Sequence, residues 1–511
     1  MRLPFSSGHS LKLGSFSPHL PFSSFSLKGP ELRYHGLLVG KSGAGKSKLI
    51  EHLMLSYISR SLKETHWLGR YSSHGATVLE PHHDLSFDIL TSLVASGFYR
   101  RRPDAYQRVV YIDFGSDYYV PFNVLSGEGD PHEKASLALD AMLRVFPELE
   151  SAPLFTELFL SGVVVLIANK LPITYLQRLF SDPLFRSECL KRVRDDEVVQ
   201  LTFDNFDRLS PTDQIQQAGS TMRRALQLSF NATTRLSLGA PDNALPLRKY
   251  MDEGRFLIFN LGGIRDELSR KILGATLMVQ LEQAALSRVD LLPTERVPHT
   301  ILVDEWPVFA ASEGSLSHIL SQARKFGLNL YLACQSLSQI SEKRLSGAFE
   351  NCKLGVFFAL GHDSAELSSK QIGDLDPYKL KKSQYDPLRP DPASPLGLGL
   401  KEKDIRSPVV HYQYLSIIDQ VQIWTNELKG LSPRHCYVKV DNRRPVKLRT
   451  PAVPSPKVDK AELEEVLATY RTLYQRSRAE AELAMQTITL KSDTRDDVIT
   501  PEPATALDWD N

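Results

Sequence analysis

The sequence predicts an α/β fold in which helices cover a sheet of mostly parallel strands, with an all-α insertion and a C-terminal extension. Three observations lead to this prediction. A glycine-rich loop separates a strand-like from a helix-like segment, short apolar runs alternate with helical patterns in two stretches, and the stretch between them has few strand signals. The chain has 511 residues, of which 42% are hydrophobic and 24% charged, as is typical of a folded globular protein.

The first α/β stretch begins near Leu32. Apolar, β-prone runs predict its strands, and apolar residues recurring every third or fourth position predict its helices. These patterns predict, in order, a strand at Leu37–Gly40, a helix from Lys46 to Ile58, a strand at Ala76–Glu80, a helix at Leu85–Val94 and a strand at Arg108–Phe114. Such alternation is typical of a parallel sheet with covering helices.

From about Glu133 to Tyr250 the pattern is almost entirely helical, and strands return afterwards. The returning strands are predicted at Phe256–Leu261, Thr300–Val303, Leu328–Ala333 and Leu354–Leu360, with helices at Asp266–Ser287, Ser315–Phe326, Glu342–Phe349 and Ser364–Ile372. The simplest interpretation is one α/β domain whose halves share a sheet and are separated by a helical insertion of roughly a hundred residues.

Composition completes the domain prediction. The end of the chain contains a Pro-rich stretch, a long helical pattern and an acidic tail typical of disorder. The predicted regions are an N-terminal arm (1–30), a first core segment (31–126), the all-α insertion (127–252), a second core segment (253–375), a linker and mixed region (376–450), a C-terminal helix (451–491) and a disordered tail (492–511).

The glycine-rich loop has the complete pattern G-x-x-x-x-G-K-S of a phosphate-binding loop. It consists of Gly40, Lys41, Ser42, Gly43, Ala44, Gly45, Lys46 and Ser47. Glycines allow successive backbone N–H groups to curl around a phosphate at a helix N-terminus. We expect Lys46 to reach the β- and γ-phosphates of a nucleotide and Ser47 to hold Mg²⁺. The alternative is an ordinary glycine turn between a strand and a helix.

The strand at Thr300–Val303 ends in two carboxylates, Asp304 and Glu305. We expect Asp304 to lie beside Ser47 in the Mg²⁺ shell, and Glu305 to accept a proton from the water that attacks the γ-phosphate, or to orient it. Strands often end in acidic residues at a surface, so this pair is a weak signal alone. The phosphate-binding loop in the same domain favours catalysis.

Two further residues are candidates with open alternatives. Gln335 directly follows an apolar strand, where an amide can sense the γ-phosphate, although a polar residue at a strand end is also ordinary. Arg324 ends a predicted helix. A cation there either stabilises the helix dipole or acts as an arginine finger on the nucleotide of a neighbouring subunit, and the sequence favours neither interpretation.

Together these motifs resemble the HerA/FtsK superfamily of hexameric ATPases, in the branch of conjugative coupling ATPases of the TraD/TraG kind. The resemblance covers roughly residues 30–375. It is carried by RYHGLLVGK (33–41), EPHHDL (80–85), YID (111–113), PFNVL (121–125), GRFLIFNL (254–261), the acidic strand, ARKFGL (323–328), ACQS (333–336) and NCK (351–353). Departures are Glu80 for Asp and His83 for Gly within D-P-H-G-D-L, Cys334 for Thr, and Trp306-Pro307 for Phe and His.

The resemblance implies a RecA-like P-loop NTPase core, ATP and Mg²⁺ as cofactors, and a homohexameric ring whose active sites lie at subunit interfaces. It also implies ATP-driven movement of DNA, of unknown strand form, through the pore of the ring. Such DNA is gripped by its phosphate backbone, largely without sequence readout. A relaxase, a nuclease or a secretion-system component is the kind of partner expected to recruit the ring.

Two other functions stay open: an ATPase that energises protein secretion or pilus assembly, and a nucleotide-dependent DNA-binding scaffold. We expect a cytoplasmic protein without the transmembrane anchor of membrane-bound coupling proteins. Any association with a membrane would go through a partner.

The net charge of +1 indicates that any basic surface must be local. A dense cluster of cations is a candidate DNA contact, the alternative being an ordinary surface strand: Arg434, Lys439, Arg443, Arg444, Lys447 and Arg449, with Asp441 as the one acid between them.

Overall fold

The computed structural model describes residues 10–16, 24–62, 71–309, 320, 322–373, 375–376, 378, 380–385 and 410–493. The chain forms two compact units. The first consists of Met1–Leu53 and Asn329–Val453, and the second of Met54–Leu328 and Pro454–Asn511. These units cut across the predicted division into two core segments and an insertion.

The first unit carries strands in the order β2-β1-β14-β13-β10-β3-β9. Their bounds are β1 (Ser10–Ser15), β2 (Ser24–Lys28), β3 (Gly36–Val39), β9 (Leu328–Cys334), β10 (Leu354–Phe357), β13 (His435–Val440) and β14 (Val446–Arg449). Strand β3 pairs in parallel with β9 and β10, whereas β13, β14, β1 and β2 extend the sheet with antiparallel pairs. The predicted strands at 37–40, 328–333 and 354–360 are therefore confirmed.

The remaining elements of the first unit flank these strands. They are η1 (Gly29–Arg33), the start of α1 (Lys46–Ser61), η8 (Leu337–Gln339), α15 (Glu342–Asn351), α16 (His362–Ile372), the hairpin of β11 (Leu380–Tyr385) and β12 (Val410–Tyr414), and α17 (Ile417–Lys429). Within the predicted arm at 1–30, β1 and β2 form an antiparallel pair that the sequence analysis did not predict. Local patterns missed them because β1 is held by β14, which lies far away in the sequence.

The second unit contains four parallel strands in the order β8-β4-β7-β5. They are β4 (Gly75–Glu80), β5 (Val109–Asp113), β7 (Phe256–Asn260) and β8 (His299–Val303), all close to their predicted positions. Nearly every residue of these strands is buried. The register pairs Asn260 with both Glu80 and Asp113, so the polar residues that end these strands lie along one edge.

Helices dominate the rest of the second unit. Next to the strands lie α2 (Asp84–Ala95), α3 (Phe98–Arg101), α4 (Ala105–Arg108), α13 (Glu267–Leu286), η5 (Ser287–Asp290), η6 (Trp306–Val308) and η7 (Ala323–Phe326). Residues 127–252 form the predicted run of helices: α5 (Pro131–Val145), η2 (Pro147–Ser151), α6 (Pro153–Ala168), η3 (Ile173–Tyr175), α7 (Leu176–Ser181), α8 (Pro183–Leu190), η4 (Lys191–Val193), α9 (Glu197–Asp207), α10 (Pro211–Phe230), α11 (Ala232–Leu238) and α12 (Leu247–Asp252). Within the regions of the chain that the structure describes, no helix has the length and hydrophobicity needed to cross a membrane.

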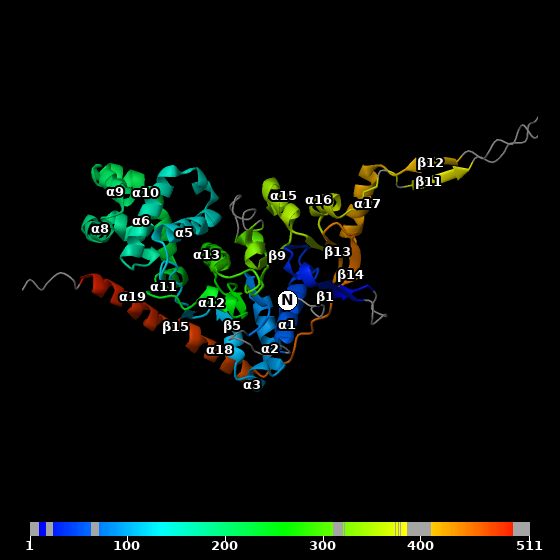
Figure 1. Ribbon diagram of the computed structural model, residues 1–511, viewed down its shortest axis with the longest axis horizontal. Helices are drawn as coiled ribbons and strands as arrows, with labels where there is room; N and C mark the ends of the chain where they lie inside the picture. The colour runs from blue at the N-terminus through cyan, green and yellow to red at the C-terminus, as the bar shows by residue number, and fades with distance from the viewer. Residues whose placement is uncertain are drawn as a thin grey trace, which may run out of the picture. The chain divides into compact units, whose positions relative to one another are not determined.

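The single C-terminal helix predicted at 451–491 is wrong. Figure 1 shows two successive helices, α18 (Lys460–Tyr474) and α19 (Arg478–Asp493), with β15 (Arg476–Ser477) between them. Strand β15 pairs with β6 (Tyr118–Tyr119), and Gln475 Nε2 donates a hydrogen bond to the carbonyl of Asp113 at 2.7 Å. These tertiary contacts replace the helical hydrogen bonds at this point. Most of the predicted tail and half of the predicted helix at 315–326 lie outside the described residues.

A buried ion pair links α5 to α13 in the second unit. Arg144 donates to both carboxylate oxygens of Glu282, at 2.9 and 2.6 Å. The side chains are only 2% and 8% exposed. Asp140 accepts a further bond from Arg144 at 2.8 Å and is partly exposed. Burial raises the pKa of Glu282, while the charge of Arg144 acts in the opposite direction. The pair fixes the first helix of the predicted insertion against a helix of the core.

A buried histidine makes the stability of the second unit depend on pH. His299 in β8 is fully buried, and its Nε2 lies 2.7 Å from Thr77 Oγ1. Burial lowers the pKa of His299 well below its usual value, and the charges of Arg288 and His74 lower it further. The unfolded chain therefore binds a proton that the folded chain excludes at mildly acidic pH, and the free energy of unfolding falls as the pH drops below about 6.5.

The variant His299→Gln tests this dependence, since it keeps a polar partner for Thr77 and cannot titrate. Between pH 6.5 and pH 5, the unaltered protein should lose about 2 kcal/mol more unfolding free energy than the variant. Urea unfolding at several pH values measures the difference, in which the contributions of other titrating groups cancel. Parallel pH profiles for the two proteins would show that His299 does not carry this dependence.

Candidate functional site

The phosphate-binding loop joins β3 to α1 in the first unit. Its backbone is anchored at the start, where Gly40 N donates to Cys334 O at 3.2 Å and Lys41 N donates to Ala359 O at 2.8 Å. A side chain at Gly40 would collide with Phe358, whose Cβ lies 2.6 Å from the position that a Cβ atom of residue 40 would occupy. Gly45 has φ +115°, which only glycine adopts readily. Both glycines are thus required by the shape of the loop.

Lys46 begins α1 and lies 6% exposed. Its Nζ donates hydrogen bonds back to the carbonyls of Gly40 at 2.5 Å and of Lys41 at 3.2 Å. The ammonium group therefore sits within the curl of the loop, where the motif requires it for contact with phosphate oxygens. Ser47 follows in the first turn of the same helix. The structure thus brings together the loop residues that the sequence predicts.

Gln335 lies close to the same loop along the chain. It is exposed and follows Cys334, the last residue of β9, whose carbonyl accepts the hydrogen bond from Gly40 N. The end of β9 is therefore attached to the beginning of the phosphate-binding loop. This attachment places the backbone of Gln335 beside the loop, as expected of a residue that senses the γ-phosphate.

A contact that the sequence did not predict braces the other side of the loop. Arg434 has φ +66° and donates its backbone N–H to Ala44 O at 2.9 Å. A Cβ atom at Gly45 would lie 3.5 Å from the Cα atom of Arg434. The region at 376–450, predicted only as a linker and mixed segment, thus supports the loop directly. The cation cluster in this region indicated a possible DNA contact. It did not indicate the hydrogen bond between Arg434 and Ala44.

The acidic pair ends β8 in the second unit. Asp304 and Glu305 are 5% and 7% exposed, and Asp304 N donates to Leu79 O of the neighbouring strand at 3.0 Å. Glu305 has φ +49°, a left-handed conformation that is uncommon for a residue with a side chain. Its backbone N–H lies 3.1 Å from Asp304 Oδ1. Backbone strain of this kind clusters at functional sites, so the conformation agrees with the role predicted for Glu305.

The structure accounts for Glu80 and His83, the two residues that depart from the pattern D-P-H-G-D-L of the resembled family. The carboxylate of Glu80 accepts hydrogen bonds from the backbone N–H groups of Leu85 and Ser86, at 2.7 and 2.5 Å, and so caps α2. Burial raises the pKa of Glu80, and the nearby negative charge of Asp304 adds to this effect. His83 has φ +81°, the conformation that a glycine at this position would adopt without strain. Its ring Nδ1 lies 2.5 Å from Asn260 Nδ2.

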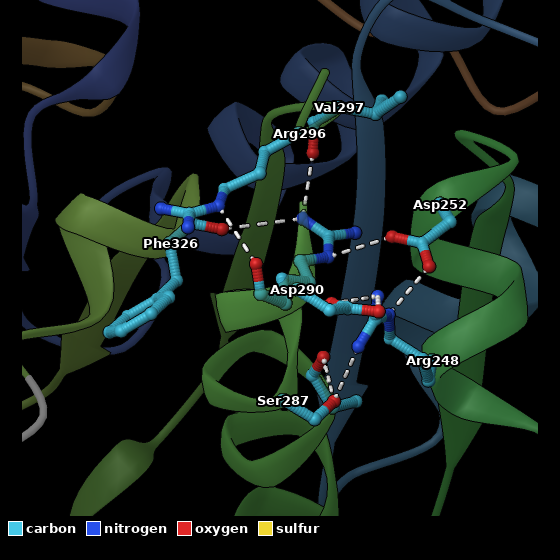
Figure 2. Close-up of polar contacts among 9 residues, drawn as sticks. Arg248, Asp252, Ser287, Asp290, Arg296, Val297 and Phe326 are labelled. Carbon is cyan, nitrogen blue, oxygen red and sulfur yellow. Dashed lines mark hydrogen bonds and ion pairs between the residues drawn. The ribbon is translucent and has the colours of Figure 1, made fainter. Parts of the chain in front are cut away.

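Arg324 is exposed on η7, a 3₁₀ turn that ends at Gly327 with φ +77°. A cluster of arginines holds this turn in the second unit. Figure 2 shows Arg296 at Phe326, where its guanidinium lies 5.0 Å from the ring centroid, and Arg296 also donates to Lys325 O at 2.7 Å. The 3₁₀ turn that ends the predicted helix at 315–326 is therefore anchored.

The same cluster continues towards α12 and η5. Buried Arg288 donates to Val297 O at 2.8 Å and pairs with Asp252 at 3.0 Å. Figure 2 also shows Asp252 contacting Arg248, which reaches Ser287 and Asp290. The described contacts fix the backbone around Arg324 and leave both interpretations of its side chain as predictions.

A strand, a glycine-rich loop and a helix on parallel strands, together with carboxylates at strand ends, define a P-loop NTPase fold with a RecA-like α/β core. Solved structures of the conjugative coupling protein TrwB have this fold. TrwBdeltaN70 in an unbound form matches with a TM-score of 0.56 and 14% identity over 89% of this chain and 98% of that chain. TrwB in complex with ADP and Mg²⁺ matches with a TM-score of 0.54 and 13% identity, over 89% and 98%.

VirB4 of Thermoanaerobacter pseudethanolicus also shares the fold, with a TM-score of 0.51 and 9% identity over 88% of this chain and 98% of that chain. No protein-family model matches the sequence, and no curated protein matches it. The likeness to TrwB and VirB4 therefore shows a common fold along most of both chains. The fold class predicted from the sequence is therefore confirmed.

Proposed function

We propose that this protein is a Mg²⁺-dependent ATPase that moves DNA through a hexameric ring. The observation that carries the proposal is an intact phosphate-binding loop, with Lys46 held inside it, in a chain that has the fold of the conjugative coupling protein TrwB. TrwB has been solved with ADP and Mg²⁺ and with a non-hydrolysable ATP analogue, which supports ATP as the nucleotide.

The described residues fit these ligands. The positive φ of Gly45 opens the loop, Lys46 supplies a buried cation, and Ser47 and the buried carboxylate of Asp304 are oxygen donors suited to Mg²⁺. Ser47 and Asp304 would hold the Mg²⁺ ion, which would supply positive charge to stabilise the phosphate groups of the nucleotide. In this proposal Glu305 accepts the proton of the attacking water.

Two residues complete the proposed cycle. Gln335 contacts the γ-phosphate or the attacking water and reports whether the phosphate is present. Arg324 acts as an arginine finger on a neighbouring subunit of the ring, and such a residue is worth about 10³–10⁵ in rate. The alternative for Arg324 is a structural role at the end of its helix, which leaves the rate unchanged.

The test is the ATPase rate of the purified protein without DNA, with single-stranded DNA and with double-stranded DNA. We expect stimulation by one form of DNA, and loss of all hydrolysis in Lys46→Ala because its cation is removed from the loop. Hydrolysis that is indifferent to DNA would instead favour an ATPase for protein secretion or pilus assembly. Absence of hydrolysis, with DNA binding retained, would favour the scaffold.

A further inference from the structure

Five of the six cations in the cluster at 434–449, all except Arg444, separate into two groups in the first unit. One group is engaged with acceptors: Lys439 donates to Gln371 O at 2.6 Å, Arg443 pairs with Glu31 at 2.5 Å and Lys447 pairs with Glu427 at 2.6 Å. The other group consists of Arg434 and Arg449. Neither forms an ion pair with any residue that the structure describes.

Arg434 and Arg449 meet a third cation around one cavity. The cavity has a volume of about 270 Å³ and is lined by Lys12, Ser15, Arg434, Arg449, Thr450 and Pro451. Strand pairing holds these residues together, because Ser15 of β1 is opposite Arg449 of β14, and Arg449 is opposite His435 of β13. The volume lies below the range of about 300–1,000 Å³ that is usual for drug-sized ligands, so it suits a small group.

The cavity lining has a positive charge that no acidic residue among its described members balances. It holds three cations and two hydroxyl groups, and its described members include no carboxylate. The Nε atoms of Arg434 and Arg449 are buried and have no hydrogen-bond partner among the described residues. Arg434 is fixed by a hydrogen bond from Nη2 to Thr450 O at 2.7 Å. Two arginines and a lysine around one cavity match the charge-assisted recognition of an oxyanion.

We propose that this cavity is a binding site for a phosphate group. The phosphate belongs either to a nucleotide or to the backbone of a nucleic acid, since both present the same oxyanion. The cavity adjoins the phosphate-binding loop through Arg434, whose backbone N–H bonds Ala44 O. The proposal rests on the proposed function only for the source of the phosphate.

The experiment measures binding, not turnover, so it is informative even if the protein hydrolyses no ATP. Three probes are titrated into the full chain: inorganic phosphate, ADP and a short fluorescent single-stranded oligonucleotide. The test variant is Arg449→Met, which keeps the aliphatic stem of the side chain. The matched control is Lys447→Met, which removes one positive charge from the same strand but away from the cavity, where Lys447 pairs with Glu427.

We expect Arg449→Met to weaken phosphate binding about tenfold, as the loss of a charge-assisted hydrogen bond predicts, while Lys447→Met changes it little. Repeating the titrations in Lys46→Ala separates the sources. If the effect of Arg449→Met on ADP disappears there, the phosphate belongs to the nucleotide in the loop. If its effect on the oligonucleotide persists there, the phosphate belongs to nucleic acid.

A second variant, Arg434→Met, guards against a folding defect in the first. Residue 434 has a left-handed backbone conformation, and Arg434 already places a side chain there. Methionine does the same, so the substitution adds no new backbone strain. Thermal unfolding identifies which variants are folded. Equal weakening by Lys447→Met, or unchanged binding of all three probes in a folded cavity variant, would overturn the proposal.

Discussion

Glu305→Gln is expected to lower the rate of ATP hydrolysis about 10²–10⁴-fold while leaving nucleotide affinity nearly unchanged. Glutamine has the size of glutamate but cannot accept the proton of the attacking water. Glu305 is 7% exposed and held in a left-handed conformation, so the amide should occupy the same place as the carboxylate. Steady-state hydrolysis and equilibrium binding of a fluorescent ATP analogue measure the two quantities separately.

Glu267→Gln is the matched control for this experiment. Glu267 lies in the exposed first turn of α13 and pairs with Lys271 at 2.7 Å. The same chemical change there should leave both hydrolysis and binding unaltered. A Glu305→Gln protein that turns over ATP within about threefold of the unaltered chain would assign proton acceptance to another group.

The phosphate-binding loop was predictable because the residues that bind phosphate are consecutive in the sequence. Glycines that permit the loop, a lysine that reaches the phosphates and a helix that follows at once form one local unit. The strand at 300–303 was equally clear, since three apolar residues, Ile301 to Val303, precede the two carboxylates. Local patterns therefore indicated the chemical groups of the candidate site and the strands that carry them.

What the sequence did not predict depends on contacts between distant segments. The hydrogen bond from Arg434 to Ala44 joins residues from opposite ends of the chain, and no local pattern indicates it. The break at Gln475 follows from a hydrogen bond to Asp113, although the surrounding pattern is continuously helical. The backbone conformation of His83 could be predicted in part. The resembled family has a glycine at this position, and a glycine often indicates the positive φ that His83 adopts here.

Removing one partner of the buried pair of Arg144 and Glu282 should strongly destabilise the second unit. Glu282→Gln is expected to lower the free energy of unfolding by about 3–5 kcal/mol, because it leaves a buried arginine without its main counter-charge. Asp140 remains as a partner, but it is 36% exposed and contacts only one nitrogen of the guanidinium group. Urea unfolding, followed by circular dichroism, measures the loss.

The double variant Arg144→Met, Glu282→Met separates the cost of an unpaired charge from the value of the pair itself. Replacing both partners by apolar residues removes the buried charges together, and such replacements are often neutral or stabilising. The double variant should therefore recover most of the stability that Glu282→Gln loses. If it is as unstable as the single variant, the pair contributes specific attraction between α5 and α13 that apolar packing does not replace.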